Sequence, residues 1–280
     1  MREISCDVIT DAVERLCVKA ATVLPPSLGI LLECAAEGEE SPAGISALED
    51  IVDNFKYAAM EGIPICQDTG MAVVFADIGQ DVHITGGSFK DAINEGVRRG
   101  YKNGLLRMSV VGDPLRRENT GDNTPCVLHF RLLPGEQIDL FVAPKGFGSE
   151  NTGAMHMFLP SDTSEAIEDF IVETVSKAGS NPCPPVVLGV GLGGTIEQCA
   201  LIAKRALLRP ADTRNSDEFY AKMERNVLEK INRLGIGPQG FGGRYTAIAV
   251  NIEIYPTHIA GLPCVVNMGC HATRHAHTML

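Results

Sequence analysis

The sequence predicts an α+β fold, an irregular mixed α/β arrangement that is not doubly wound. Apolar residues recur at helical spacing through residues 1–61, which indicates a helical N-terminal region. Strands and helices are then mixed without the regular alternation that builds a parallel sheet. The 280 residues contain no internal repeat, low-complexity tract or linker. A single domain over residues 1–280, with a core of its own, is therefore expected.

Two amphipathic helices are expected in the N-terminal region. The first has an apolar stripe over residues 8–20 and must end before Pro25 and Pro26, because proline lacks the amide hydrogen that a helix interior requires. The second has its stripe over residues 45–59 and runs up to Gly62. The acidic segment 37–44 between them is predicted to be a loop.

The middle of the chain mixes strand and helix patterns. A strand is expected over residues 71–78 and a helix over 89–103. Two strand-like runs, 126–132 and 137–143, flank the turn residues 134–136, and this pattern predicts a β-hairpin.

Further elements are expected toward the C-terminus. In order they are a glycine-punctuated loop over 144–152, a helix over 163–178 closed by Gly179, a buried strand over 186–190, a helix from 196 ended by Pro210, and a helix over 216–232. Thr195 and Gln198 have the spacing of a capping box. Residues 247–254 alternate in polarity, so a half-buried strand with Asn251 on its polar face is expected.

Composition and charge exclude several classes of protein. The net charge is −11 and no block of lysine or arginine occurs, so the chain offers no surface for electrostatic binding of nucleic acid. The N-terminus lacks the apolar stretch of a signal peptide, and no run approaches the length of a membrane span. Nine scattered cysteines are typical of a reducing cytoplasm, where thiols pack in the core or bind metals.

Three of the cysteines have unusual surroundings. Cys66 stands in "PICQDTG", Cys183 in "SNPCPP" and Cys270 in "NMGCHATRH", each in a loop or at the end of an element. Their wide separation excludes zinc knuckles and ferredoxin motifs, which need closely spaced pairs. Three thiolates from distant loops could hold a cubane iron–sulfur cluster and leave its fourth iron open, or the thiols could be inert. For Cys17, Cys34, Cys126, Cys199 and Cys264 packing is expected, and Cys6 is uninformative.

Four blocks carry a resemblance to a known family. They are "PICQDTG", "KGFGSEN", "CPPVVLGVGLGGTIEQCALIAKRALLR" and "LPCVVNMGCHATRH". In this order they resemble the class I iron–sulfur fumarases and the related L(+)-tartrate dehydratases, over nearly the whole chain. The similarity is to the catalytic α-type unit of these hydro-lyases, which is a separate subunit in some members and is fused to a β-type domain in others.

The resemblance implies a set of site residues and a cofactor. The ligands of a [4Fe-4S] cluster fall on Cys66, Cys183 and Cys270. The catalytic residues fall on Asp68 and His258, and the substrate-binding residues on Gln67, Arg107 and Gly148.

The resemblance also implies a reaction and a partner. The expected reaction is the reversible hydration of fumarate to malate, with an open ferrous iron polarising the C–O bond; the alternative is L(+)-tartrate dehydration. Because the chain ends at Leu280 without a β-type unit, a separate β subunit in a cytoplasmic α2β2 heterotetramer is expected. The residues do not decide which of Asp68 and His258 is the acid.

Simpler readings compete with these assignments. Asp68 could simply cap a turn and have no catalytic role, since Asp-Thr-Gly is a typical turn sequence. Gly189, Gly191 and Gly194 match the dinucleotide pattern G-x-G-x-x-G, which gives an NAD-dependent oxidoreductase as a rival. We favour tight packing of strand against helix for these glycines. A non-catalytic subunit with inert cysteines is a second rival.

Three histidines near the C-terminus form one further pattern, namely His271, His275 and His277. The spacing of the first two would suit a zinc site. A solvated C-terminal segment that packs on the β subunit is the favoured interpretation.

Overall fold

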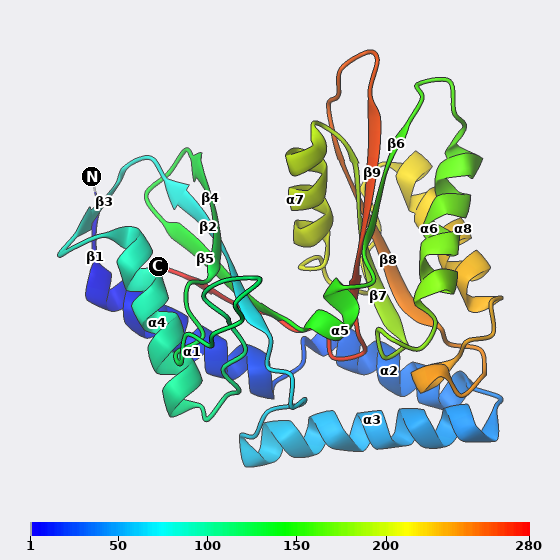
Figure 1. Ribbon diagram of the computed structural model, residues 1–280, viewed down its shortest axis with the longest axis horizontal. Coiled ribbons are helices and arrows are strands. Elements are labelled where there is room, and N and C mark those ends of the chain that lie inside the picture. Colours follow the sequence, from blue (N-terminus) through cyan, green and yellow to red (C-terminus); the bar gives the residue numbers. More distant parts are fainter. Residues whose placement is uncertain (1) are drawn as a thin grey trace. The chain divides into compact units, whose positions relative to one another are not determined.

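The computed structural model describes residues 2–280 and confirms an α+β fold of helices α1–α8 and strands β1–β10 (Figure 1). The chain forms two compact units. Unit 1 comprises the chain up to Pro25, together with Tyr57–Phe147 and Arg274–Leu280. Unit 2 comprises Pro26–Lys56 and Gly148–Thr273.

Unit 1 is built on a four-stranded sheet with the order β10-β5-β2-β4. Its strands are β2 (Met71–Gly79), β4 (Val127–Leu133), β5 (Ile138–Lys145) and β10 (Ala276–Met279). Helices α1 (Cys6–Thr22) and α4 (Phe89–Asn103) bury their apolar faces with the inner face of this sheet in one core. A short parallel pair, β1 (Arg2–Ser5) and β3 (Val82–Thr85), completes the unit.

The predicted β-hairpin is wrong, although both of its strands exist. β2 lies between β4 and β5, parallel to β4 and antiparallel to β5. The connection crosses the end of β2, where the Gly79 amide donates to the Gln137 carbonyl over 2.8 Å. A Cβ on Gly79 would lie 2.4 Å from the Gly135 oxygen, so only glycine allows this crossing. Turn residues mark where a chain reverses, but they do not say which strands pair.

The N-terminal region is helical as predicted, with one helix more than expected. α2 spans Pro26–Gly38 and α3 spans Pro42–Glu61, so the predicted loop over 37–44 shrinks to residues 39–41. Both helices begin at a proline, which suits the first helical position because the amide there needs no intrahelical partner. The proline pair that ends α1 therefore also starts the next helix.

One segment of this region meets the length and hydropathy criteria of a membrane-crossing helix, contrary to the prediction that no run would. An 18-residue window within Cys6–Gly38 has a mean hydropathy of 1.4, and 50% of that window is buried inside the protein. The segment consists of two helices, α1 and α2, separated at residues 23–25. The buried core helix of a soluble protein passes the same test.

Unit 2 contains a second four-stranded sheet with the order β6-β9-β7-β8. Its strands are β6 (Ala154–Phe158), β7 (Val186–Gly193), β8 (Ala247–Tyr255) and β9 (Leu262–Gly269). Helix α7 (Ile196–Ala206) covers one face, and α6 (Ser164–Ala178) and α8 (Glu218–Asn232) lie on the other (Figure 1). The short helix α5 (Phe147–Glu150) replaces part of the loop predicted over 144–152.

Several local predictions in unit 2 are settled by this packing. Gly179 ends α6 with a positive φ of 56°, as expected. The capping box at Thr195 is wrong, because the Thr195 hydroxyl bonds the Glu197 carboxylate and caps no backbone amide. β8 is buried over most of its length, not half-buried, since helices cover both faces and Asn251 is fully buried.

The glycines of "GVGLGG" allow α7 to pack directly on β7. A Cβ on Gly189 would lie 2.2 Å from the Ala203 oxygen, and a Cβ on Gly191 would lie 2.2 Å from the Cys199 oxygen. This confirms close packing of strand against helix. The dinucleotide interpretation is wrong here, because both glycines lie inside a buried strand paired with β8 and β9, where their amides cannot cradle a phosphate.

The close approach of α7 predicts a large effect of a single methyl group. Gly191→Ala should lower the free energy of unfolding by about 1 to 3 kcal/mol, because the helix must move to admit the Cβ. The chain has no tryptophan, so urea unfolding is best followed by circular dichroism. Gly112→Ala is the control, since the nearest atom to its Cβ would be 3.8 Å away. Equal unfolding midpoints for the two variants would contradict the packing argument.

Candidate active site

The candidate site residues are divided between the two units. Unit 1 carries Cys66, Gln67, Asp68 and Arg107, and unit 2 carries Gly148, Cys183, His258 and Cys270. Each group is built by its own unit.

In unit 1, Asp68 lies in the loop that connects α3 to β2, and both of its carboxylate oxygens accept backbone hydrogen bonds. Oδ1 accepts from the Gly70 amide at 3.0 Å, which is the turn cap that the simpler reading expects. Oδ2 accepts from the Phe147 amide at 3.0 Å, at the start of α5. A side chain that only capped its own turn would need one of these bonds. The second bond ties the Asp68 carboxylate to the segment "KGFGSEN".

An arginine that the sequence analysis did not single out contacts the backbone of Asp68. The Arg274 side chain is buried, and its Nη2 donates to the backbone oxygen of Asp68. Its Nε is buried without a hydrogen-bond partner among residues 2–280. A buried guanidinium with so few partners is costly, and it gives this part of an acidic protein a local positive charge.

The loop that carries Asp68 is held by two fully buried polar side chains. The Tyr101 hydroxyl donates to the Thr69 oxygen at 2.8 Å, and Asn123 Nδ2 donates to the Gly70 oxygen at 3.2 Å. Burial raises the pKa of Tyr101, so its hydroxyl remains a proton donor across the physiological range. The Thr69 hydroxyl in turn donates to the Arg107 oxygen at 3.1 Å, which places Arg107 beside the loop.

The remaining side chains of this group are accessible. Gln67 and Arg107 are exposed, and Arg107 makes no ion pair with any of residues 2–280. Cys66 is partly exposed, and its thiol lies 3.5 Å from Gln67 Oε1. Unit 1 therefore presents a thiol, a carboxylate, an amide and a guanidinium from two loops that are hydrogen-bonded to each other.

In unit 2, the loops of Cys183 and Cys270 lie side by side. The His271 amide donates to the Cys183 oxygen at 3.2 Å. Gly148 lies against the first of these loops, since a Cβ built on it would be 3.5 Å from the Asn181 oxygen. Cys183 is exposed and has a positive φ of 55°, which is rare for residues other than glycine, and Cys270 is partly exposed.

His258 does not join this group within the chain. It lies in the loop that precedes β9, whereas Cys270 directly follows the last residue of that strand. The two residues are therefore at opposite ends of the eight residues of β9, a length of about 26 Å at the rise of an extended strand. His258 is exposed, and its Nδ1 accepts from the Ala260 amide at 3.1 Å.

The other cysteines mostly behave as predicted. Cys17, Cys199 and Cys264 are buried, and desolvation raises the pKa of all three, to about 11 for Cys199. Cys126 packs against the core of unit 1, and desolvation raises its pKa to about 11. Packing is thus confirmed for these four thiols. It is wrong for Cys34, which lies on the exposed side of α2, and Cys6 is buried at the start of α1.

The C-terminal histidines lie within folded structure. The segment 276–279 forms the edge strand β10 with Ala276 buried and His277 and Met279 exposed, so the predicted solvated segment is in fact ordered and only partly solvated. His277 stacks on Phe141 and bonds the Asp139 carboxylate, while burial lowers the pKa of His275 to about 4. Among residues 2–280, no three His, Cys, Asp or Glu side chains are grouped to hold a single metal ion.

The donor set fits the cofactor that the resemblance implies. Thiolates are the usual ligands of iron–sulfur clusters, and Cys66, Cys183 and Cys270 are all at least partly accessible and belong to loops. The buried thiols Cys17 and Cys264, by contrast, are strongly disfavoured as thiolates.

Comparison with known proteins gives matches over almost the full length. The family model described as fumarate hydratase (Fumerase) matches residues 10–279. A protein of Methanocaldococcus jannaschii named "Putative L(+)-tartrate dehydratase subunit alpha" is 40% identical over 274 residues, which are 96% of each chain. The L(+)-tartrate dehydratase subunit alpha of Escherichia coli strain UTI89 is 29% identical over 95% of this chain and 88% of its own. The protein of that name in strain K12 is 28% identical over the same shares.

Proposed function

Because the chain belongs to the fumarate hydratase (Fumerase) family, we propose that it hydrates fumarate to malate reversibly as the α-type subunit of a two-subunit enzyme. The family match and the alpha-subunit relatives make the chain a hydro-lyase subunit. The substrate is the proposed part. The family match, which runs from residue 10 to residue 279, is the observation that carries it.

L(+)-tartrate is the second candidate substrate, and a specific observation favours it. The relatives compared above are named as tartrate dehydratase subunits, including the one that is 40% identical. Fumarate, malate and tartrate all carry two carboxylates, and they differ in hydroxyl groups. A site that discriminates among them must provide or withhold a hydrogen-bond partner for a hydroxyl.

The proposed cofactor is a [4Fe-4S] cluster held by Cys66, Cys183 and Cys270. The accessibility of these thiols and the resemblance of their surroundings support the assignment. When bound, such a cluster supplies an open, Lewis-acidic iron for the hydroxyl and the adjacent carboxylate of the substrate. Three cysteine ligands on a four-iron cluster would leave one iron without a protein ligand, and that iron would be open to the substrate.

The other residues have roles that follow from their donors. Arg107 is an exposed guanidinium without an ion pair among residues 2–280, so it is available to a substrate carboxylate as a bidentate donor. Gln67 can donate or accept a hydrogen bond next to Cys66. Gly148 lets its backbone amide approach an anion without a Cβ in the way.

Asp68 and His258 are the proposed proton-transfer residues. The two backbone amides that bind the Asp68 carboxylate fix its orientation, as a general acid or base requires. His258 lies at the other end of β9 from Cys270, so in one chain it cannot reach the thiols of its own unit. We infer that His258 serves the site of a second copy of the chain.

The proposed assembly follows from this inference and from the relatives. Those relatives are named as alpha subunits, which supports a separate partner subunit for this chain. We propose that the partner is β-type, that the assembly is an α2β2 heterotetramer, and that it works in the cytoplasm. A symmetric pair of α chains would allow each copy to supply a His258 to the other.

The decisive experiment is a substrate assay of the two-subunit complex. The chain and the β-type subunit of the same organism are purified together without oxygen, loaded with iron and sulfide, and assayed with fumarate, malate and L-tartrate. We expect the highest kcat/KM for the fumarate–malate pair and no turnover by this chain alone. A preference for L-tartrate would establish the second candidate. Full turnover without the partner would refute the two-subunit proposal. Saturable NADH binding by a protein that takes up no cluster would instead favour the rival hypothesis of an NAD-dependent oxidoreductase.

A further inference from the structure

A tight loop in unit 2 touches the residues that follow two of the three proposed cluster ligands. The loop covers residues 237–243 and includes a short 3₁₀ helix, Pro238–Gly240. A Cβ on Gly240 would lie 2.4 Å from Ser180 Cβ, so the loop packs directly against the turn that leads to Cys183. Within it, Gln239 has a φ of 53°, a left-handed backbone conformation that costs free energy for any residue other than glycine.

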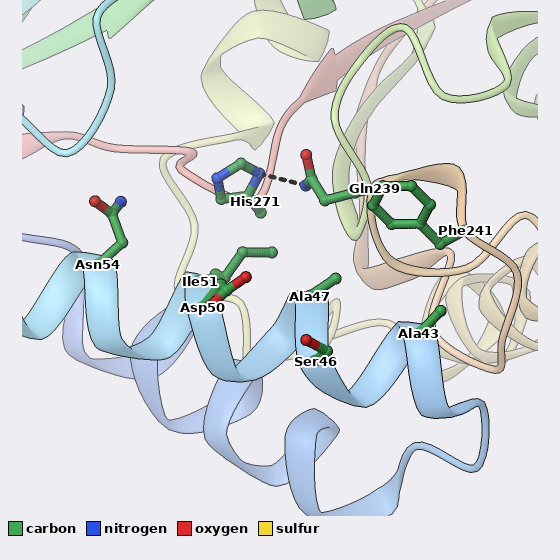
Figure 2. Close-up of a pocket in the computed structure, with 9 residues that line it drawn as sticks. All are labelled: Ala43, Ser46, Ala47, Asp50, Ile51, Asn54, Gln239, Phe241 and His271. Atoms are coloured by element: carbon green, nitrogen blue, oxygen red, sulfur yellow. Dashed lines mark hydrogen bonds between the residues drawn. The ribbon is translucent and has the colours of Figure 1, made fainter.

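Gln239 makes three hydrogen bonds to this region. Its backbone amide and its side-chain Nε2 both donate to the Pro184 oxygen, at 2.8 Å and 2.7 Å. Nε2 also lies 3.1 Å from His271 Nδ1, and the two side chains point toward each other (Figure 2). Pro184 follows Cys183 and His271 follows Cys270, so one side chain bridges the segments that carry both thiols.

The His271 ring also contacts the loop of Cys183. Its Nδ1 lies 3.1 Å from Gln239 Nε2 and 3.1 Å from the Cys183 carbonyl oxygen, and the same oxygen accepts from the His271 backbone amide at 3.2 Å. One ring nitrogen therefore meets both the Gln239 side chain and the backbone of Cys183.

The bridge has little support from packing on one side. Gln239 and His271 form part of the wall of a groove of about 470 Å³, which is otherwise lined by Phe241 and by one face of α3 (Figure 2). Because one side of these two side chains faces the groove, their hydrogen bonds help to hold them together. The strained backbone of Gln239 is therefore most simply understood as the cost of directing its amide at both loops.

We propose that Gln239 is a positioning residue that sets the spacing of the Cys183 and Cys270 thiols by joining their loops through His271. The inference rests on the proposed function, because the spacing matters only if these thiols hold a cluster. Removal of a group that orients a metal ligand typically weakens metal binding about 10- to 100-fold. The same loss is expected here, as faster release of the cluster.

The test compares four variants with a matched control after anaerobic reconstitution. Gln239→Leu removes the amide at similar size and Gln239→Glu removes its donors, so both should release iron to a chelator about 10- to 100-fold faster than the unsubstituted chain. His271→Gln should do the same, whereas His271→Asn should retain the cluster, because the asparagine amide can take the place of Nδ1 beside Gln239 and the Cys183 oxygen. Gln80→Leu, at an exposed glutamine, is the control.

Two readouts make the outcomes distinguishable. Iron release and the electron paramagnetic resonance spectrum report the cluster, and hydrogen exchange of the His271 amide in the cluster-free protein reports the bridge itself. If the unsubstituted chain takes up no cluster, the proposed function fails. If it does and Gln239→Leu releases iron at the same rate, the positioning role fails. If Gln239→Leu does not fold by circular dichroism, the His271 pair decides, and equal release by its two variants overturns the inference.

Discussion

Replacing any one of Cys66, Cys183 and Cys270 with alanine is expected to abolish stable cluster binding. Each substitution removes the protein ligand of one iron and leaves the cluster with only two thiolates. No other accessible thiol among residues 2–280 belongs to the same loops and could replace the missing one. The measurement is the content of iron and sulfide per chain after anaerobic reconstitution, together with the visible absorption of the cluster. We expect the content to fall from a full cluster to near zero.

Two other cysteines provide matched controls for this series. Cys199→Ala removes a buried thiol that donates to the Gly191 oxygen, and burial raises the pKa of that thiol to about 11. Cys34→Ala removes an exposed thiol from α2, and so tests whether accessibility alone is sufficient. Both variants should keep the cluster. If all five variants lose it, or all five keep it, the assignment of the three ligands is wrong.

Mixing two inactive variants is expected to restore activity. Asp68→Asn and His258→Asn should each be inactive as pure assemblies. If His258 serves the site of another copy, random pairing of the two variants gives mixed pairs in which one site has both native residues. About one quarter of all sites would then be intact. The measurement is the turnover of subunits exchanged or co-expressed in equal amounts, with the β-type partner present.

The control for this mixture uses two residues on the same side of the site. Asp68 and Arg107 lie in loops joined by the Thr69 hydroxyl within unit 1. Mixing Asp68→Asn with Arg107→Ala should restore nothing, because every site in a mixed pair contains one substituted residue. Equal activity of the two mixtures, or no restoration in either, would contradict a His258 supplied by another copy.

Much of the fold could be predicted because it depends on local patterns. The helix over 89–103 was predicted at its observed bounds, and the packing role of Gly189 and Gly191 followed from a strand pattern followed by a helix pattern. The order of strands could not be predicted. The turn at 134–136 announces a reversal, but the insertion of β2 between β4 and β5 depends on pairing energies over long sequence separations.

The candidate site divides in a similar way. Six of the eight residues assigned by resemblance lie in the four sequence blocks quoted above, whereas Tyr101, Asn123 and Gln239 lie outside them. These three residues act through contacts with residues distant in sequence. Arg274 lies within the last block, but its hydrogen bond to the Asp68 oxygen joins residues 206 positions apart, which the block itself does not reveal. The position of His258 could not be seen either, because twelve residues can form a turn or a strand that separates their ends by its full length.

The length of β9 has a consequence for regulation. If each chain presents Cys183 and Cys270 at one end of this strand and His258 at the other, each of two copies supplies its His258 to the site of the other copy. A lone, newly made chain would then carry ligands for a cofactor but would have no means to use it. Association itself would switch the enzyme on, so the cofactor could be inserted before any catalysis begins.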